Sequence, residues 1–384
     1  MAVASGIIVA DITYLQPLLH LVRLDLHTSV AATSALLTFT QVGYVMGLAL
    51  IAPLGDVWPR RRLIVGVFLV AAVAMATVAV VPNYLTLASL LFVIGVTSVG
   101  GQLLVPFAAD LSPDATRGRT IGIVMSGLLS GVLLSRVVAG YVAQLFGWRG
   151  VYVVAALALV AMAMTLARYL PLEAPRERVP YTRVIAESFT MLKTSSLLRR
   201  RSWLGAATMG SLNVVWATLA FHLAASPFHY SSGTIGLFGL VGLSGIAMAN
   251  VAGRLADQGR VRQTTILCAA LMVVSYVLLW VGAASVLVIG FAIIVVDAGA
   301  QGMQISNQTV IYAIAPEKRS RVNSPYMVTF FLGVAAGSLG AGFAYASFGW
   351  SGACAFGLLL ALASLVLAVT MRAEPTIATG SPTS

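Results

Sequence analysis

Three ionisable side chains lie inside long apolar runs of this 384-residue chain: Asp11, Arg136 and Asp297. Charge within such a run is costly and marks a functional site by default. Burial disfavours the ionised form of a carboxyl, which suits Asp11 as a proton carrier. We expect Asp11 and Arg136 to approach one another in one state of the protein and to separate in another. The alternative is structural: a static pair, or an aspartate hydrogen-bonded to Thr13 and the backbone.

Asp297 also belongs to a polar stripe. Spacings of four, three and four residues place Asp297, Gln301, Gln304 and Gln308 on one face of a helix, with Asn307 beside them. Such a stripe cannot face lipid without leaving hydrogen-bond donors and acceptors unpaired. It therefore predicts the lining of a water-filled cavity, with a hydrogen-bonded seam between helices as the alternative.

Other polar and aromatic side chains within apolar runs are weaker candidates for the cavity wall: Tyr14, Gln41, Tyr44, Gln102, Asn213 and Trp216. Tyr14 and Trp216 could stack on an aromatic or sugar ligand, or they could simply pack. No His, Cys, Asp or Glu cluster has metal-ligand spacing. No phosphate-binding loop or nucleophile elbow occurs either. The sequence thus predicts no metal, no cofactor and no enzymatic activity.

Composition indicates a membrane protein. Hydrophobic residues make up 59% of the chain and charged residues only 9%, against about 25% charged in soluble domains. The net charge of +11 comes from basic residues in short gaps between apolar runs. That placement is typical of orientation signals and argues against nucleic-acid binding. Both cysteines, Cys268 and Cys354, lie within apolar runs, so a disulfide framework is not expected.

The apolar runs predict an all-α membrane protein with twelve helices, each about 20 or more residues long. The expected spans are 2–21, 29–53, 62–81, 84–109, 119–145, 149–170, 202–226, 232–252, 264–284, 286–313, 322–347 and 351–371. Basic residues concentrate on one side of this arrangement. The positive-inside rule then places both termini and the central loop in the cytoplasm.

The chain divides into two six-helix bundles, residues 1–170 and 202–371. A linker with an amphipathic helix, 171–201, joins them, and a disordered tail covers 372–384. A shift of 202 residues superimposes the halves: Gly131 falls on Gly333, and Trp148 falls on Trp350. The same shift places Asp11 on Asn213. Such an internal repeat predicts pseudo-symmetric bundles related by an axis along the membrane normal.

Two charged loops carry a family resemblance. Residues 54–62 read Leu-Gly-Asp-Val-Trp-Pro-Arg-Arg-Arg, and residues 253–262 contain a near copy. The pair resembles the loop signature of the major facilitator superfamily, although Ala52 and Pro59 stand where that family has glycines. Segments 11–18 and 305–308 look like bacterial arabinose-efflux-permease-like members. Residues 135–140 resemble the fifth-helix motif of drug–proton antiporters, with Arg136 in place of its proline.

The resemblance implies a cytoplasmic latch, in which loop carboxylates sit against helix N-termini of the other half. Its members would be Asp56, Arg60, Arg61, Arg117 and Asp257. It also implies a monomeric secondary transporter of the bacterial inner membrane. Such a protein would work by alternating access and exchange protons for a small organic molecule, a drug or a sugar. An importer or facilitator of a sugar, amino acid or other metabolite is the runner-up. A non-transporting membrane sensor or scaffold is the rival from another class.

Overall fold

The computed structural model describes residues 1–56, 58–113, 116–171, 190–314 and 319–371, and these are helical with short connections. The first membrane pass is broken into α1 (Ala2–Ala10), η1 (Gln16–Leu18) and α2 (Leu19–Asp25). The rest of the first half comprises α3 (Val30–Met46), continued by η2 (Gly47–Ile51) and η3 (Ala52–Asp56), α4 (Arg60–Val78), α5 (Tyr84–Ser98), α6 (Gly100–Asp110) and α7 (Arg117–Tyr169).

The second half repeats this order. It comprises α9 (Ser196–Ala224), α10 (Ser232–Leu237), η4 (Phe238–Gly242), α11 (Leu243–Asp257), α12 (Val261–Val281), α13 (Val286–Ile314) and α14 (Arg319–Thr370). Side-chain caps define where several helices begin. The Asn83 side chain accepts the backbone N–H of Thr86 at 2.9 Å, and the Ser29 hydroxyl accepts that of Ala32 at 3.1 Å. These oxygens satisfy backbone donors that have no partner within the helix.

Nine helices of the described chain are long and apolar enough to cross a membrane. Two of them, α7 and α14, each contain two passes, because the chain turns back at Gly147 (φ 74°) and Gly349 (φ 62°). Only glycine adopts this backbone conformation without strain. With the broken first pass, the described helices account for the twelve predicted passes. The all-α architecture and the duplicated order of elements are therefore confirmed.

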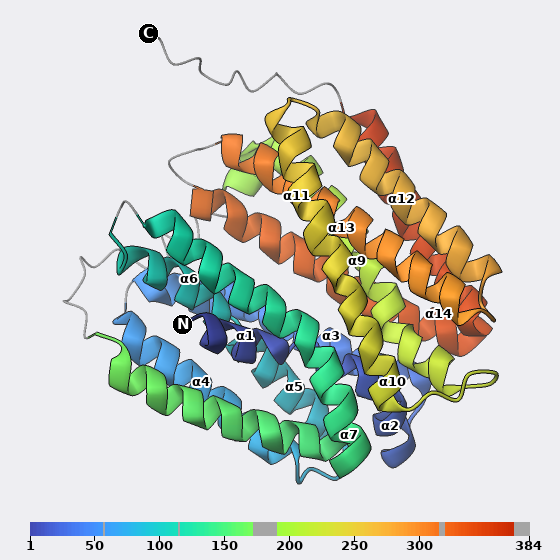
Figure 1. Cartoon of the computed structure of the whole chain (residues 1–384), viewed down its shortest axis with the longest axis horizontal. Helices are drawn as coiled ribbons and strands as arrows, with labels where there is room; N and C mark the ends of the chain where they lie inside the picture. Colours follow the sequence, from blue (N-terminus) through green and yellow to red (C-terminus); the bar gives the residue numbers. More distant parts are fainter. Residues whose placement is uncertain (57, 114–115, 172–189, 315–318, 372–384) are drawn as a thin grey trace.

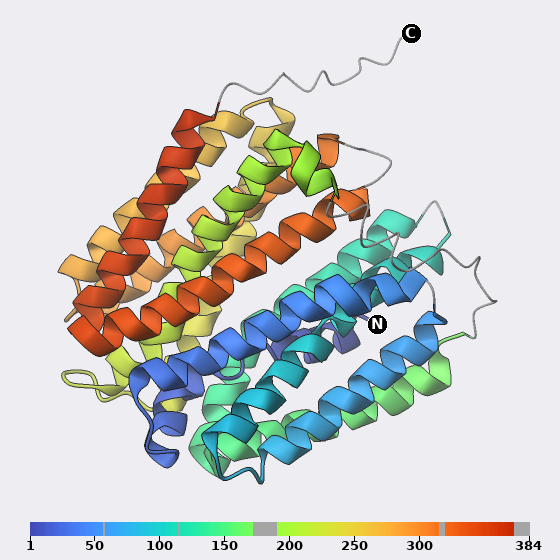
Figure 2. The ribbon, with the colours of Figure 1, turned by 180° about the vertical axis from the view of Figure 1, so that it is seen from behind.

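The two halves form separate bundles that converge at one end (Figures 1 and 2). We call this the far end; it carries the turns at Gly147, Gly349 and residues 225–231. The opposite end, from which residue 171 leaves the first half and residue 196 enters the second, we call the linker end. There the bundles splay apart, in both views, so that the molecule is V-shaped.

Glycines set the closest helix contacts in both halves. A Cβ added at Gly131 in α7 would overlap the backbone of Gly6 in α1, and one added at Gly333 in α14 would overlap that of Ala206 in α9. Small residues allow backbones to approach closely where lipid provides no hydrophobic driving force. Since Gly131 and Gly333 are related by the 202-residue shift, the repeat in the sequence is also a repeat in packing.

Replacing Gly131 by leucine should destabilise the protein by about 1–3 kcal/mol, because the added side chain must displace the Gly6 backbone. Thermal unfolding of the purified protein in detergent measures this change. Gly66→Leu is the matched control, because a Cβ added at Gly66 in α4 meets no atom within 4 Å. Equal unfolding temperatures for the two variants would contradict the close contact between α1 and α7.

The halves meet along two seams that run from the far end to about mid-depth. In one seam, α3 packs against α14: the Thr38 hydroxyl donates to the Ala335 carbonyl at 3.2 Å, and the Tyr44 ring meets Phe331 edge-on at 4.5 Å. In the other, α7 packs against α10 and η4. The Ser232 hydroxyl donates there to the Gly140 carbonyl at 3.0 Å. Further along the second seam, the side chain of Arg136 covers Gly239.

The boundary between linker and second bundle differs from the prediction. Helix α9 begins at Ser196, so Arg199, Arg200 and Arg201 belong to its first turns. Arg199 and Arg200 are exposed, but Arg201 is only 2% exposed and lies in the core. The predicted amphipathic helix and the tail fall mostly outside the described residues; of the former, residues 190–194 are helical.

Candidate functional site

The first pass breaks at the predicted proton carrier. Helix α1 ends at Ala10, and Pro17 follows in η1. Proline has no N–H to donate to the carbonyl four residues earlier, and its ring clashes with that carbonyl. Asp11 stands at the break, 3% exposed, and neither carboxyl oxygen has a hydrogen-bond partner among the described residues. Thr13 does not bind Asp11, contrary to the structural alternative. Its hydroxyl instead contacts the Ser135 hydroxyl at 2.6 Å.

Arg136 reaches across from the first half to the second. Its Nε donates to Oε1 of Gln16 at 2.6 Å, and its guanidinium lies 4.0 Å from the centre of the Trp216 ring. A cation over an indole face is attracted by the ring quadrupole. In this state Arg136 and Asp11 form no ion pair. Gln16 was missed in the sequence, although an amide beside Pro17 at mid-helix was a usable signal.

Asp297 faces the same seam from the second half. It is 7% exposed, and its Oδ2 lies beside glycines of η4 and α11: a Cβ added at Gly245 would be 2.9 Å away, and one at Gly242 would be 3.5 Å away. The charges of Asp297 and Arg136 interact electrostatically across the interface. Two of the three predicted intramembrane charges are therefore brought together, although the predicted partner of Arg136 was Asp11.

The rest of the polar stripe divides between two environments. Gln301, Gln304 and Gln308 are partly exposed, and Gln301 packs on Gly245 beside Asp297. Asn307 is fully buried, and its Oδ1 accepts a hydrogen bond from Arg201 at 3.1 Å. Asn307 thus belongs to a seam between helices, which was the alternative reading of the stripe.

Arg201 is a buried cation that sequence reasoning missed. It also donates to the Thr265 hydroxyl at 3.2 Å, so that it joins α9, α12 and α13. Its position next to two other arginines led to the prediction that it lies at the membrane surface. Only the earlier start of α9 at Ser196 turns its side chain into the bundle.

The weaker candidates take several positions. Gln102 is partly exposed, and its Nε2 donates to Oη of Tyr44 at 3.3 Å. Gln41 is 2% exposed. The amide of Asn213 binds the Ser338 hydroxyl and therefore ties α9 to α14 within the second half. Tyr14 is half-buried near Asp11.

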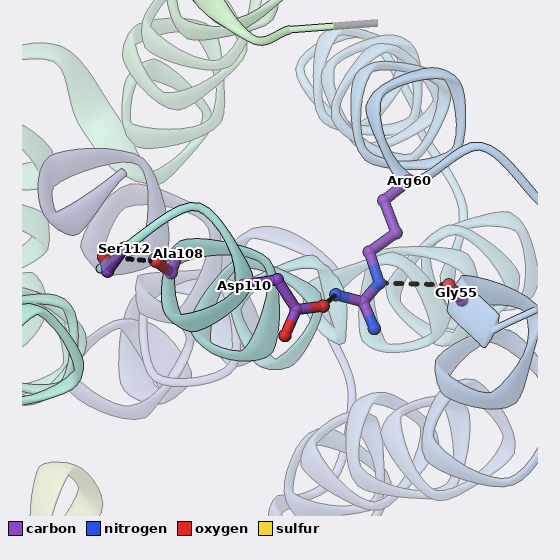
Figure 3. A network of polar contacts seen from close by, with 5 residues as sticks. All are labelled: Gly55, Arg60, Ala108, Asp110 and Ser112. Atoms are coloured by element: carbon purple, nitrogen blue, oxygen red, sulfur yellow. Dashed lines mark hydrogen bonds and ion pairs between the residues drawn. The ribbon is translucent and has the colours of Figure 1, made fainter. Parts of the chain in front are cut away.

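The arginine loop holds the linker end of the first half together (Figure 3). Arg60 Nε donates to the Gly55 carbonyl at 3.0 Å, and its Nη1 pairs with Oδ2 of Asp110 at 2.7 Å. Arg61 donates to the Ala167 carbonyl. Both arginines thus bind groups of their own half. The side chains of Asp56, Arg117 and Asp257 lie outside the described part of the structure. Asp110 was missed, although an acid at a helix end facing an arginine loop was a usable signal.

A small recess adjoins the Arg136 guanidinium. Beside Arg136, Gln16 and Trp216, its walls are apolar: Pro17, Leu219, Ala220 and Ile235. The site therefore combines one cation, one carboxylate across the seam, an aromatic face and an apolar recess. No group of three or more metal-binding side chains occurs among the described residues.

Comparison with known proteins agrees with this architecture. The family model of the Major Facilitator Superfamily matches residues 1–311. The uncharacterized transporter YgaY of Escherichia coli O157:H7 is 40% identical over 367 residues, covering 96% of this chain and 93% of the relative. A probable transporter of Streptomyces coelicolor is 32% identical, covering 92% of this chain and 83% of the relative.

A solved structure shows the same fold. It is a bacterial homologue of the human lysosomal transporter Spinster, in an inward-facing and occupied conformation. The TM-score is 0.73 at 15% identity, with 96% of this chain and 93% of that chain covered. Fold, family model and relatives identify a membrane transporter rather than an enzyme. The chain belongs to the major facilitator superfamily.

Proposed function

We propose that this transporter exports a small organic molecule from the bacterial cytoplasm in exchange for protons. It works by alternating access, with its two halves rocking about a site at mid-depth. The observation that carries the proposal is that opposite charges on opposite halves, Arg136 and Asp297, lie against the same short helix η4, at Gly239 and Gly242, and interact electrostatically. A charge pair that spans the moving interface can bind differently in the two states, as coupling requires.

The distribution of arginines supports a cytoplasmic linker end. The helix ends and connections there carry Arg60, Arg61, Arg62, Arg254 and Arg260, whereas the far end carries Arg23 and Arg149. Short loops rich in arginine stay on the cytoplasmic side of bacterial inner membranes. With this orientation, the splayed end opens to the cytoplasm and the far end closes the site from outside.

Two carboxyls can carry the proton. Asp11 stands in the first half without a hydrogen-bond partner among the described residues, and Asp297 stands in the second half beside Arg136. The hydrogen bond between Thr13 and Ser135 links the Asp11 break to the helix turn that bears Arg136. A change at Asp11 can therefore be transmitted to the substrate site.

The latch remains part of the proposal. When the linker end closes, Asp56 would approach the N-terminal end of the eleventh pass, and Asp257 the fifth pass. Helix N-termini favour such carboxylates by about 0.3–1 kcal/mol. The direction of transport rests on the resemblance of residues 11–18 and 305–308 to efflux proteins.

Transport by inside-out membrane vesicles tests the function. With an acidic interior, such vesicles should accumulate a substrate from a compound panel, and an uncoupler should abolish the accumulation. Vesicles without the protein are the control. Equal fluxes in both directions that ignore the uncoupler would show a facilitator. Gradient-driven accumulation only in right-side-out vesicles would show an importer.

A further inference from the structure

Two charged groups of the site keep hydrogen-bonding capacity that the described residues do not satisfy. The Nε of Arg136 donates to Gln16, and one face of the guanidinium stacks on Trp216. Its terminal nitrogens form no hydrogen bonds to the described residues. The Asp297 carboxylate accepts no hydrogen bond within the described part of the chain. The two groups interact electrostatically but form no ion pair.

Neighbouring residues hold both groups in place. Trp216 and Gln16 hold the guanidinium from two sides. On the other half, Gly242 and Gly245 pack closely beside Oδ2 of Asp297, so that a Cβ at Gly245 would stand at only 2.9 Å from it. A cation anchored on one half and an anion on the other form a bipolar receptor across the moving interface.

We propose that the substrate is a zwitterion, an α-amino acid or close analogue, whose carboxylate binds Arg136 and whose ammonium group binds Asp297; this rests on the proposed function. Charge-assisted hydrogen bonds at both ends would satisfy both groups. A ligand with one charge would leave the opposite group of the site without a partner, which is costly away from water. The zwitterion alone neutralises both.

The pocket beside Arg136 indicates the third part of the ligand. Its walls beyond the guanidinium and the Trp216 ring are Pro17, Leu219, Ala220 and Ile235. Such a lining favours an apolar part of a ligand over a polar one, because apolar surface leaves water there without unpaired polar groups. We therefore expect substrates with an apolar side chain, for which leucine and phenylalanine are test compounds.

This chemistry gives the exchange with protons a direct form. A proton that binds the Asp297 carboxylate removes the negative charge that the ammonium group needs. Proton and substrate then compete for Asp297, so that protonation on the outer side releases the substrate. Competition of this kind produces antiport rather than symport.

Binding of a matched ligand set to the purified full-length protein in lipid nanodiscs tests the proposal. The set contains leucine, leucinamide (cation), N-acetylleucine (anion) and N-acetylleucinamide (neutral), together with the four corresponding forms of phenylalanine. Calorimetry should show at least tenfold tighter binding of one zwitterion than of its three derivatives. Equal binding of derivatives and zwitterions, or binding of none of the eight compounds, would overturn the proposal.

Two variants separate recognition from a structural role. Asp297→Asn should transfer the preference to the N-acetyl anion, and Arg136→Gln should transfer it to the amide cation. A uniform loss of affinity for all forms in both variants would contradict the proposal. Arg149→Gln is the control, because Arg149 also stacks on a tryptophan, Trp148, but pairs with Asp25 at the far end. It should leave the ligand ranking unchanged.

The proposed function and this inference can fail separately. If zwitterions bind with the expected ranking but vesicles show no gradient-driven flux, the site stands and proton-coupled export fails. If vesicles drive export of a neutral or singly charged compound, and Arg136→Gln leaves its affinity unchanged, export stands and the zwitterion assignment fails.

Discussion

Asp11→Asn should lower accumulation driven by a pH gradient at least tenfold, because one of the two proton-carrying carboxyls is lost, while exchange of substrate for substrate continues. The Asp11 side chain is 3% exposed, and both of its oxygens lack hydrogen-bond partners among the described residues. An unpartnered carboxylate within a membrane costs several kcal/mol, so the site is suited to a carboxyl that gains and loses a proton. Asparagine has nearly the same shape but cannot release a proton.

The two fluxes are measured on the same reconstituted vesicles, with and without an imposed pH gradient. Asp25→Asn is the matched control, because Asp25 lies at the exposed far end and pairs with Arg149 at 2.5 Å. It should leave gradient-driven accumulation within about twofold of the parent protein. Full gradient-driven transport by Asp11→Asn would remove Asp11 as the carrier and leave Asp297 as the remaining candidate.

A covalent cross-link between the two halves at the far end should lower the transport rate more than tenfold, and reduction of the cross-link should restore the rate. Thr38 and Ala335 face each other across the seam, with the Thr38 hydroxyl 3.2 Å from the Ala335 carbonyl oxygen. Thr38→Cys with Ala335→Cys, joined by a short reducible cross-linker, would hold the far end shut. Since alternating access requires this seam to open, the substrate could no longer leave on that side.

The cross-link is made in a background where the two buried native cysteines, Cys268 and Cys354, are replaced by alanine. Thr28→Cys with Thr33→Cys is the control pair. The hydroxyls of these residues lie 2.9 Å apart within the first half, so that joining them should not affect rocking. Undiminished transport across the bridged Thr38–Ala335 seam would show that the far end does not open during the cycle.

Much of the architecture could be predicted from the sequence because the repeat fixes it. Gly147 and Gly349 occupy equivalent places and both turn the chain with positive φ. Gly131 and Gly333 also occupy equivalent places, and each packs against the first helix of its own half. The length of an apolar run and the positions of small residues can be read directly from the sequence. They indicate membrane-spanning helices and close helix contacts whichever helices pack together.

The partners of individual charges could not be predicted in the same way. Which side chain meets Arg136 depends on how far each helix is rotated, and the break between Ala10 and Gln16 changes that rotation for the first pass. Asp11 consequently lies apart from Arg136, and Gln16 takes the place that Asp11 was expected to hold. Arg201 shows the same limit, since an earlier helix start turned a predicted surface residue inward.

The distances between the halves at their two ends test the central claim most directly. Spin labels at Arg62 and Arg262 report the linker end, and labels at Leu85 and Leu287 report the far end; all four side chains are exposed. Pulsed electron paramagnetic resonance on the reconstituted protein should reveal two populations as pH and substrate vary. In the second, the linker-end distance shortens while the far-end distance lengthens. Distances that stay fixed, or that change together in the same direction, would contradict alternating access.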